Sequence, residues 1–181
     1  GLASIGREAD LARLFGFIAA DPLRLAGATL LTGFFVHGGP LHWFTNAYFL
    51  LMLGDNVEDL IGRRRFIALL ATTTMMGALA HALFDPRAAV PLVGASGAIS
   101  GVMTFYSLQF PHARVGVFLW RHGIGGWFTM PVWFAFALWL LLQLAASGLQ
   151  IGGMGHVSSL AHLGGVVAGL FWWHACGRRE A

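Results

Sequence analysis

Three short segments place polar side chains beside apolar stretches, in combinations that suit acyl transfer. They are His37–Asn46, Pro91–Gly101 and Ala161–Gly169. Acyl transfer needs a nucleophile, a general base and donors that stabilise an oxyanion. The segments contain a serine, histidines and an asparagine, so each segment is a candidate part of one site.

The first segment carries a candidate oxyanion hole. His42 and Asn46 are four residues apart, so on a helix they share one face. Both side chains donate hydrogen bonds without carrying a charge, which suits stabilisation of a developing oxyanion. The alternative is structural, with both side chains hydrogen-bonded to neighbouring helices.

The second segment contains Gly94-Ala95-Ser96-Gly97. A serine at the start of a helix exposes its hydroxyl beside free backbone N–H groups, which together with the helix dipole can hold a negative oxygen. The alternative is that Gly97 and Gly101 form a small-residue packing stripe of which Ser96 is only a part.

The third segment places His162 inside an apolar stretch, ahead of Gly165 and Gly169 on one helix face. If that face packs against the glycines that follow Ser96, His162 comes beside the serine. A neutral imidazole could then take the serine proton and return it to a leaving amine. The alternatives are a histidine hydrogen-bonded across helices or one of several metal ligands.

Acidic residues limit the chemistry further. Between Leu60 and Arg179 the only carboxylate is Asp85, so no buried acid is predicted to orient His162 as in a triad. A serine protease built here would use a Ser–His dyad. Zinc-protease chemistry is disfavoured because the sequence has no His-Glu-x-x-His helix.

The composition predicts an integral membrane protein. Of 181 residues, 57% are hydrophobic and 10% charged, and the mean hydropathy is +0.70, whereas soluble domains carry about 25% charged residues. Charged residues are absent from 25–54, 66–84, 88–113 and 122–177. A soluble enzyme, a nucleic-acid-binding protein and a secreted disulfide scaffold are therefore disfavoured, the last because Cys176 is the only cysteine.

The elements that must position the three segments are membrane-spanning helices. Five are predicted, at Leu41–Leu53, Phe66–Phe84, Ser96 to just before Pro111, Met130–Ala146 and Ser158–Ala175. A polar stretch, 54–59, ends the first, and 114–126 connects the third to the fourth. Residues 1–40 are expected to form an interfacial segment and outer loop, 41–177 the helical core, and 178–181 a cytoplasmic tail.

Arginine positions predict the orientation. All eleven positive residues are arginines, and cytoplasmic loops of membrane proteins are enriched in them. If the run Arg63–Arg65 is cytoplasmic, alternation places Arg114, Arg121 and the tail on the same side. The spans that begin at Leu41, Ser96 and Ser158 then start at the outer side, so their polar residues should lie at similar depth.

Together the three segments resemble the motifs of the rhomboid family of intramembrane serine proteases, over about residues 11–177. The resemblance rests on His42 and Asn46 within 37–46, on Gly94–Gly97 and on Ala161–Gly165. The stretch Gly54–Asp59 with the arginines that follow is similar to the bacterial branch.

The resemblance implies an all-α, rhomboid-like helical bundle with Ser96 as nucleophile and His162 as general base. His42, Asn46 and the Ser96 backbone N–H would form the oxyanion hole. The residues implied to lie beside the reacting group are Gly94, Gly97 and His37. No cofactor and no metal are implied.

The resemblance also implies substrates and a location. Substrates would be single-pass membrane proteins, cut near the outer face, with the lipid bilayer and no nucleic acid as the other partner. The span 130–146 would be a gate and 147–156 a cap. A bacterial inner membrane is expected, with the site open to the periplasm. Neither the physiological substrate nor the oligomeric state follows from the sequence.

Three departures from the family pattern are visible. The family has a six-helix core, and its first helix would precede residues 11–40, so we expect an upstream piece to have been removed. This chain has Ser100 where some members have an aromatic residue that supports the catalytic histidine. It has Ala28-Thr29 where members often have a Trp-Arg pair. Because Ser100 cannot stack on a ring, His162 must be positioned by another group.

Two other functions stay open. A non-catalytic rhomboid-like protein would bind membrane helices, although it would have no chemical need for both Ser96 and His162. A transporter or metal site would use several histidines, but the spans contain no carboxylates, which proton and metal relays usually employ. The histidines in question are His37, His42, His81, His156 and His162.

Overall fold

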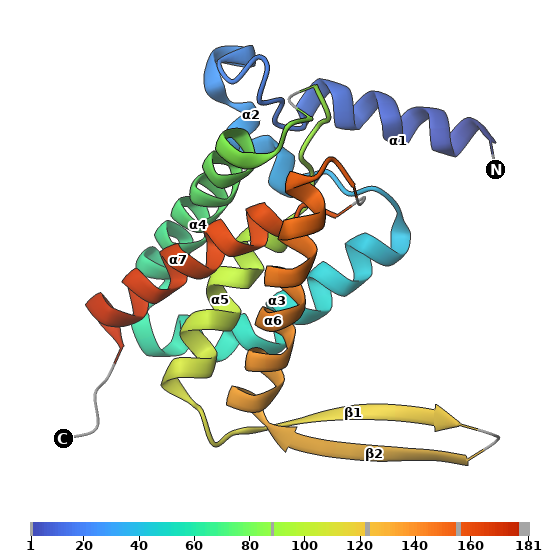
Figure 1. Ribbon diagram of the computed structural model, residues 1–181. Coiled ribbons are helices and arrows are strands. Elements are labelled where there is room, and N and C mark those ends of the chain that lie inside the picture. The colour runs from blue at the N-terminus through green and yellow to red at the C-terminus, as the bar shows by residue number, and fades with distance from the viewer. Residues whose placement is uncertain (1, 88, 122–123, 155–156, 178–181) are drawn as a thin grey trace.

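The computed structural model describes residues 2–87, 89–121, 124–154 and 157–177. They form a mostly helical bundle with one β-hairpin at its edge (Figure 1). The elements are α1 (Leu2–Phe15), α2 (Thr29–Thr32), α3 (Pro40–Ile61), α4 (Arg63–Phe84), α5 (Ser96–Gln109), β1 (Arg114–Arg121), β2 (Ile124–Pro131), α6 (Val132–Ile151) and α7 (Ser159–Cys176), with short 3-10 turns at Arg24–Gly27 and Gly33–Phe35. All five predicted spans coincide with helices, so the predicted helical fold is confirmed.

Helix α3 is longer than predicted. It begins with Pro40 in its first turn, where the missing N–H of proline costs no hydrogen bond. It continues through the polar stretch 54–59, which was expected to end it, and stops at Gly62. Gly62 has φ +83°, a conformation that glycine adopts without strain. The acidic residues do not break the helix because Asp55 and Asp59 are exposed to solvent.

The connection between α5 and α6 is a β-hairpin. Strands β1 and β2 pair antiparallel, from Arg114 opposite Pro131 to Arg121 opposite Ile124. The fourth predicted span therefore begins later than expected, at Val132, because Met130 and Pro131 belong to β2. Its helix also extends to Ile151, so the first five residues of the expected cap, 147–156, are helical.

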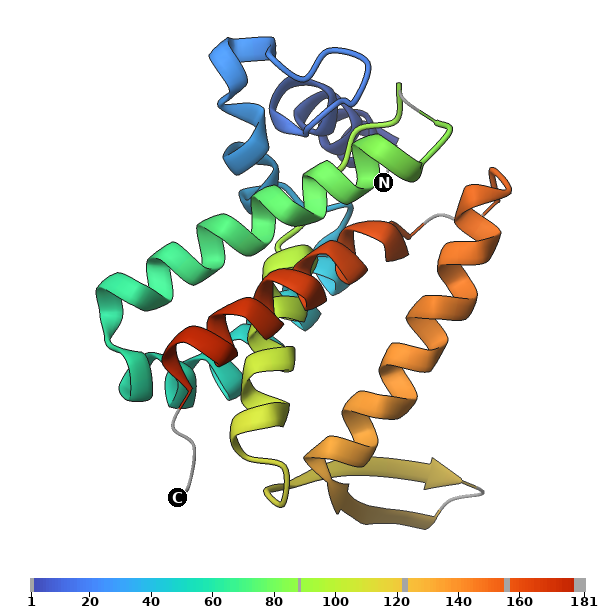
Figure 2. The same ribbon diagram turned by 60° about the vertical axis from the view of Figure 1, so that its left-hand side comes forward.

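Helices α5 and α7 cross at backbone contact (Figure 2). Gly165 lies so close to the Gly97 carbonyl oxygen that a Cβ at Gly165 would overlap it, and Gly169 is related in the same way to Gly101. Helix α4 joins them at Gly77, where a Cβ would lie 2.8 Å from the Ala161 carbonyl oxygen. The expected close approach of the two glycine faces is thus present.

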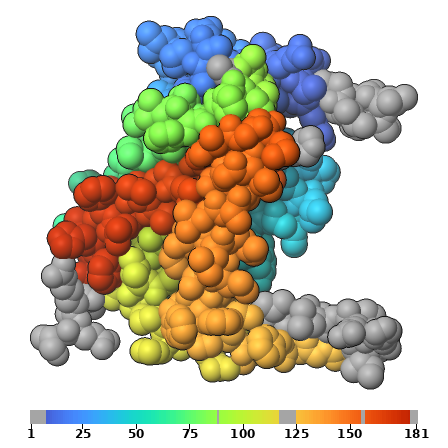
Figure 3. All heavy atoms as spheres, in the orientation of Figure 1, coloured from blue at the N-terminus to red at the C-terminus, as the bar shows by residue number. Residues whose placement is uncertain are grey.

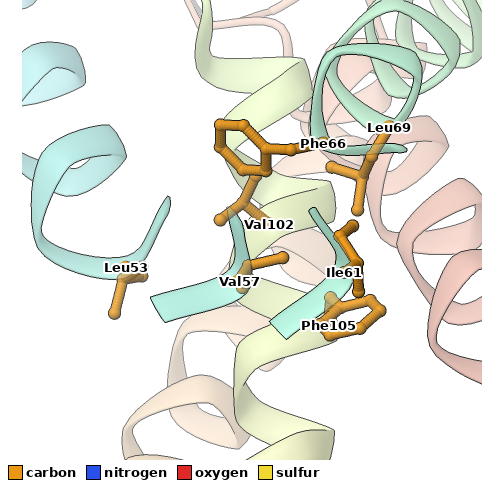
Figure 4. Close-up of a cluster of buried hydrophobic side chains, with 7 residues drawn as sticks. All are labelled: Leu53, Val57, Ile61, Phe66, Leu69, Val102 and Phe105. Atoms are coloured by element: carbon orange, nitrogen blue, oxygen red, sulfur yellow. The ribbon is translucent and has the colours of Figure 1, made fainter. Parts of the chain in front are cut away.

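A second packing centre lies toward the other end of α5. Buried side chains from α3, α4 and α5 form one apolar cluster (Figure 4), made of Leu53, Val57, Ile61, Phe66, Leu69, Val102 and Phe105. Val57, Leu69, Val102 and Phe105 are completely buried. Val102 and Phe105 thereby fix α5 against α3 and α4 beyond the turn that carries Ser96.

Two described helices, α4 and α6, are long and apolar enough to cross a membrane. Their packing differs, because α6 buries only Val132, Ser147 and Gln150. In the space-filling view α6 lies on the molecular surface beside α7 (Figure 3). Helix α5 has only 14 residues, about 21 Å at 1.5 Å per residue, which is shorter than the roughly 30 Å hydrocarbon core of a bilayer.

The N-terminal segment docks on the loop that precedes α5. Phe17 and Leu92 exchange backbone hydrogen bonds of 3.0 and 2.7 Å, and the Gly94 N–H donates to the Gly33 carbonyl at 2.8 Å. Segment 16–33 therefore fixes the backbone just ahead of Ser96. The interfacial position expected for residues 1–40 stays a prediction.

A buried polar network ties the end of α4 to the end of α6 and the start of α7. The Asp85 carboxylate accepts hydrogen bonds from the Arg87 guanidinium at 2.8 and 2.9 Å and from the Gln150 amide at 2.5 Å. Gln150 in turn accepts from the Leu160 N–H at 2.9 Å. The Ser158 hydroxyl lies 3.0 Å from Nδ1 of His81. The network holds together the ends that flank the short link between α6 and α7.

Replacing Asp85 with asparagine is expected to lower the free energy of unfolding by about 1–3 kcal/mol, since buried groups lose a charged partner. The Arg87 guanidinium, more than any other group, holds the pKa of Asp85 well below its usual range. The carboxylate therefore adds stability above the unfolded-state pKa of about 3.9, and this is lost as the pH falls toward the folded-state value.

Unfolding of both proteins in detergent between pH 3 and 8 checks this. The stability difference between wild type and Asp85→Asn should shrink as the pH falls below about 4. A difference independent of pH would contradict the role given to the carboxylate charge.

Candidate active site

Ser96 is presented by a tight turn at the start of α5. Gly94 has φ +106°, which favours glycine, and a Cβ there would lie 2.7 Å from the His42 ring. Ala95 caps the helix, and its carbonyl accepts from the Ile99 N–H at 2.9 Å. The N–H groups of the first turn thus have no partner within the helix and point toward the residues ahead of it.

His162 lies beside Ser96. Its Nε2 is 2.8 Å from the Ser96 Oγ, a hydrogen bond between helices α5 and α7. His162 is 8% exposed, one turn into a helix whose N-cap is the Ser158 side chain. The glycine contacts between α5 and α7 are the reason that the two side chains meet, because any larger residue would separate the helices.

Two side chains of α6 that sequence reasoning missed complete the surroundings of His162. The Oε1 of Gln143 is 2.8 Å from the His162 Nδ1. Trp139, one turn earlier, holds its ring 6.1 Å from the imidazole at an angle of 36°. The Ser100 hydroxyl donates to the Ser96 carbonyl at 2.7 Å, so Gln143 and Trp139 supply the contacts to the His162 ring that Ser100 cannot supply by stacking. The one feature of the sequence that could have indicated Gln143 is its polar amide within an otherwise apolar helix.

His42 and Asn46 face the same space from α3. The Gly38 N–H donates to Nδ1 of His42 at 3.2 Å, which leaves the proton of a neutral ring on Nε2. The Asn46 amide donates one bond to the His42 carbonyl at 2.7 Å, so its second N–H is available. His37 stacks edge-on against His42, with ring centres 5.1 Å apart. Burial lowers the pKa of His37.

One open cavity of about 1020 Å³ joins these groups. Its polar lining includes His42, Asn46, Ser96, Ser158 and His162. Its apolar lining includes Phe49, Ile99, Met103, Trp139 and Val157. The cavity is large enough for an extended peptide segment, and its lining includes a hydroxyl, an imidazole and two uncharged donors.

The remaining predicted residues are placed as follows. Gly97 packs against Gly165 and Ala161 at the helix crossing, whereas Gly94 shapes the turn before Ser96. His81, one histidine of the metal hypothesis, contacts Ser158 and Asp85 instead of the other histidines. His156 and the tail 178–181 lie outside the described residues.

Comparison with known proteins identifies the family. The model of the Rhomboid domain matches residues 26–179. Rhomboid protein 1, mitochondrial, of Saccharomyces cerevisiae is 30% identical over 148 residues, which are 77% of this chain and 39% of that protein. Rhomboid-like protease 5 of Toxoplasma gondii is 30% identical over 143 residues, 79% of this chain and 15% of the relative.

A third relative is Presenilin-associated rhomboid-like protein A, mitochondrial, of Danio rerio, 28% identical over 144 residues, 76% of this chain and 34% of the relative. The chain thus spans less than half the length of these relatives. All three are eukaryotic and two are named mitochondrial, so they give no support to the expected bacterial inner membrane.

No solved structure matches the chain. The domain match covers most of the 181 residues, including every residue of the candidate site. The helical bundle, with helices apolar enough to cross a membrane, agrees with that match. The chain therefore belongs to the rhomboid family of membrane-embedded proteins.

Proposed function

We propose that this protein is an intramembrane serine endopeptidase with a Ser–His dyad. The observation that carries the proposal is the 2.8 Å hydrogen bond between Ser96 Oγ and His162 Nε2 inside a peptide-sized cavity. A nucleophile within hydrogen-bond reach of its base is the arrangement that covalent catalysis requires. A relative named as a protease, Rhomboid-like protease 5 of Toxoplasma gondii, supports the same reaction class.

In the proposed reaction the Ser96 Oγ bonds the scissile carbonyl carbon while its proton passes to Nε2 of His162. The carbonyl electron pair moves to the oxygen and gives a tetrahedral oxyanion. When the oxyanion collapses, the C–N bond breaks and the imidazolium gives its proton to the leaving amine. Water then attacks the acyl ester, its proton passes to His162, and Ser96 leaves with that proton.

The oxyanion has three donors nearby in this proposal. They are Nε2–H of His42, the second amide N–H of Asn46 and the backbone N–H of Ser96. All three carry no formal charge, and fixed dipoles of this kind stabilise an oxyanion without reorganising as it forms. The positive end of α5 adds to the same field.

The proposed substrates are single-pass membrane proteins whose helix unwinds near the outer face. The cavity suits an extended chain, and the exposed helix α6 is the proposed gate, because it buries few of its side chains. The arginine pattern supports a cavity that opens on the side away from the cytoplasm. A bacterial inner membrane stays a prediction from the sequence alone.

Replacing Asn46 with alanine is expected to lower kcat about 10²–10³-fold, since one oxyanion donor is lost. The turnover of a fluorogenic transmembrane substrate in detergent measures this. Asn56→Ala is the matched control, because Asn56 makes the same side-chain bond to the carbonyl four residues earlier, at Met52, but is exposed. Equal loss of activity in both variants would contradict a role for Asn46 in the reaction.

Labelling with a fluorophosphonate, which bonds only activated serines, tests the proposed function directly. We expect wild-type protein to be labelled at Ser96. A folded wild-type protein that resists labelling would favour the non-catalytic, helix-binding alternative.

A further inference from the structure

The imidazole of His162 is held by an uncharged partner. Its Nδ1 is 2.8 Å from Oε1 of Gln143, and its Nε2 is 2.8 Å from Ser96. No carboxylate touches the ring within the described part of the chain. Asp85, the only acid between Leu60 and Arg179, is engaged by Arg87 and Gln150.

The amide oxygen of Gln143, rather than its NH2 group, faces Nδ1 of His162. An amide oxygen only accepts hydrogen bonds, so the bond requires a proton on Nδ1. In a neutral ring Nε2 is then unprotonated and can accept the hydroxyl proton of Ser96. The opposite form would direct an N–H at Ser96 and could not act as its base.

Helix geometry gives Gln143 a further part in fixing the ring. Gln143 and Trp139 are four residues apart on α6, so they share the face that meets His162. Trp139 limits the tilt of the imidazole from one side, while the amide limits its rotation. Ser96 and His162 lie on α5 and α7, so the orientation of the base depends on where α6 lies.

We infer that Gln143 is a positioning residue that holds His162 in the form able to deprotonate Ser96, in place of the carboxylate of a catalytic triad. The inference rests on the proposed function. It predicts that position 143 needs a side chain that accepts a hydrogen bond from Nδ1 of His162, whether that side chain is charged or neutral. It also predicts that a charge at 143 changes the pH dependence of Ser96 reactivity.

Three variants test this. Gln143→Met keeps the side-chain length but removes the acceptor, and Gln143→Glu keeps the acceptor and adds a charge. Gln150→Met is the matched control. It makes the same Gln-to-Met change at a second glutamine of α6, whose partners are Asp85 and Leu160. The readout is the rate constant of fluorophosphonate labelling of Ser96 between pH 5 and 9, with unfolding midpoints measured in parallel.

Gln143→Met is expected to slow labelling about 10–100-fold, by analogy with the loss on removing a group that orients a metal-binding histidine. Gln143→Glu should recover most of the rate. Its acid limb should move to higher pH, because a carboxylate stabilises the imidazolium, which cannot act as a base. The titratable group that faces His162 from α3 is His42, and from α4 the nearest is His81, bonded to Ser158. Both are unchanged in all variants.

Gln150→Met should lower the unfolding midpoint without moving the acid limb. The inference is overturned if Gln143→Met is labelled at the wild-type rate, if Gln143→Glu fails to recover it, or if the acid limb of Gln143→Glu coincides with that of wild type. Unlabelled wild-type protein would instead refute the proposed function, so the two failures are distinguishable.

Discussion

Replacing Ser96 with alanine is expected to abolish both fluorophosphonate labelling and substrate cleavage while the protein stays folded. Removing the nucleophile of a serine protease costs on the order of 10⁶ in kcat, so residual turnover should fall below detection. His162→Ala should have the same effect, because the hydroxyl has no other base within hydrogen-bond reach among the described residues. The measurement is labelling and cleavage of one transmembrane substrate by purified protein in detergent.

Ser107→Ala is the matched control, because Ser107 is another buried serine of α5, three turns from Ser96. It should be labelled and active like wild type. Cleavage that persists in Ser96→Ala would remove the dyad from the mechanism. Labelling that persists in His162→Ala would mean that another group activates the serine.

Replacing Gly165 with alanine is expected to lower the free energy of unfolding more than any other proposed substitution. The added Cβ would overlap the Gly97 carbonyl oxygen and lie 3.2 Å from the Ser100 Cβ. Neither neighbour can rotate away, because one is backbone and the other is fixed to it. Overpacking of this kind costs about 1–3 kcal/mol and more where backbone must move, so we expect a loss of about 3 kcal/mol or failure to fold.

Reversible unfolding in detergent measures this loss. Gly148→Ala is the control, because a Cβ on this α6 glycine meets nothing within 4 Å. Alanine should there stabilise the helix by about 0.5–1 kcal/mol through its better helix propensity. Equal midpoints for Gly165→Ala and wild type would show that α5 and α7 can separate without cost, contrary to the packing described.

The sequence was sufficient to predict how the candidate site is assembled. Ser96 at a helix start, His162 in an apolar helix and glycines on both faces lead to one close crossing, and the structure has that crossing. Apolar stretches also located the five helices from α3 to α7, but not α1, which has as many residues as α5. These features are local or periodic, so they can be read without knowing what packs against them. The chemical roles of the residues remain predictions.

Other features depend on tertiary context. The polar stretch 54–59 reads as a loop because charges end an apolar pattern, yet it continues α3 where part of its surface is exposed. Gln143 carries no charge, and nothing in the spacing of α6 says which helix its amide meets. The hairpin 114–131 depends on pairing between two strands with little polarity contrast. In each case the outcome depends on what surrounds the segment in the folded protein, which local sequence patterns do not show.

The shortness of α5 has a consequence for the second half of the reaction. If the far end of a 14-residue helix lies at one membrane surface, Ser96 lies below the opposite surface, where hydrocarbon excludes water. Hydrolysis of an acyl ester consumes one water molecule in each turnover, so this water must reach Ser96 through the open cavity. A bound substrate fills part of the same cavity, so substrate and water compete for the same space.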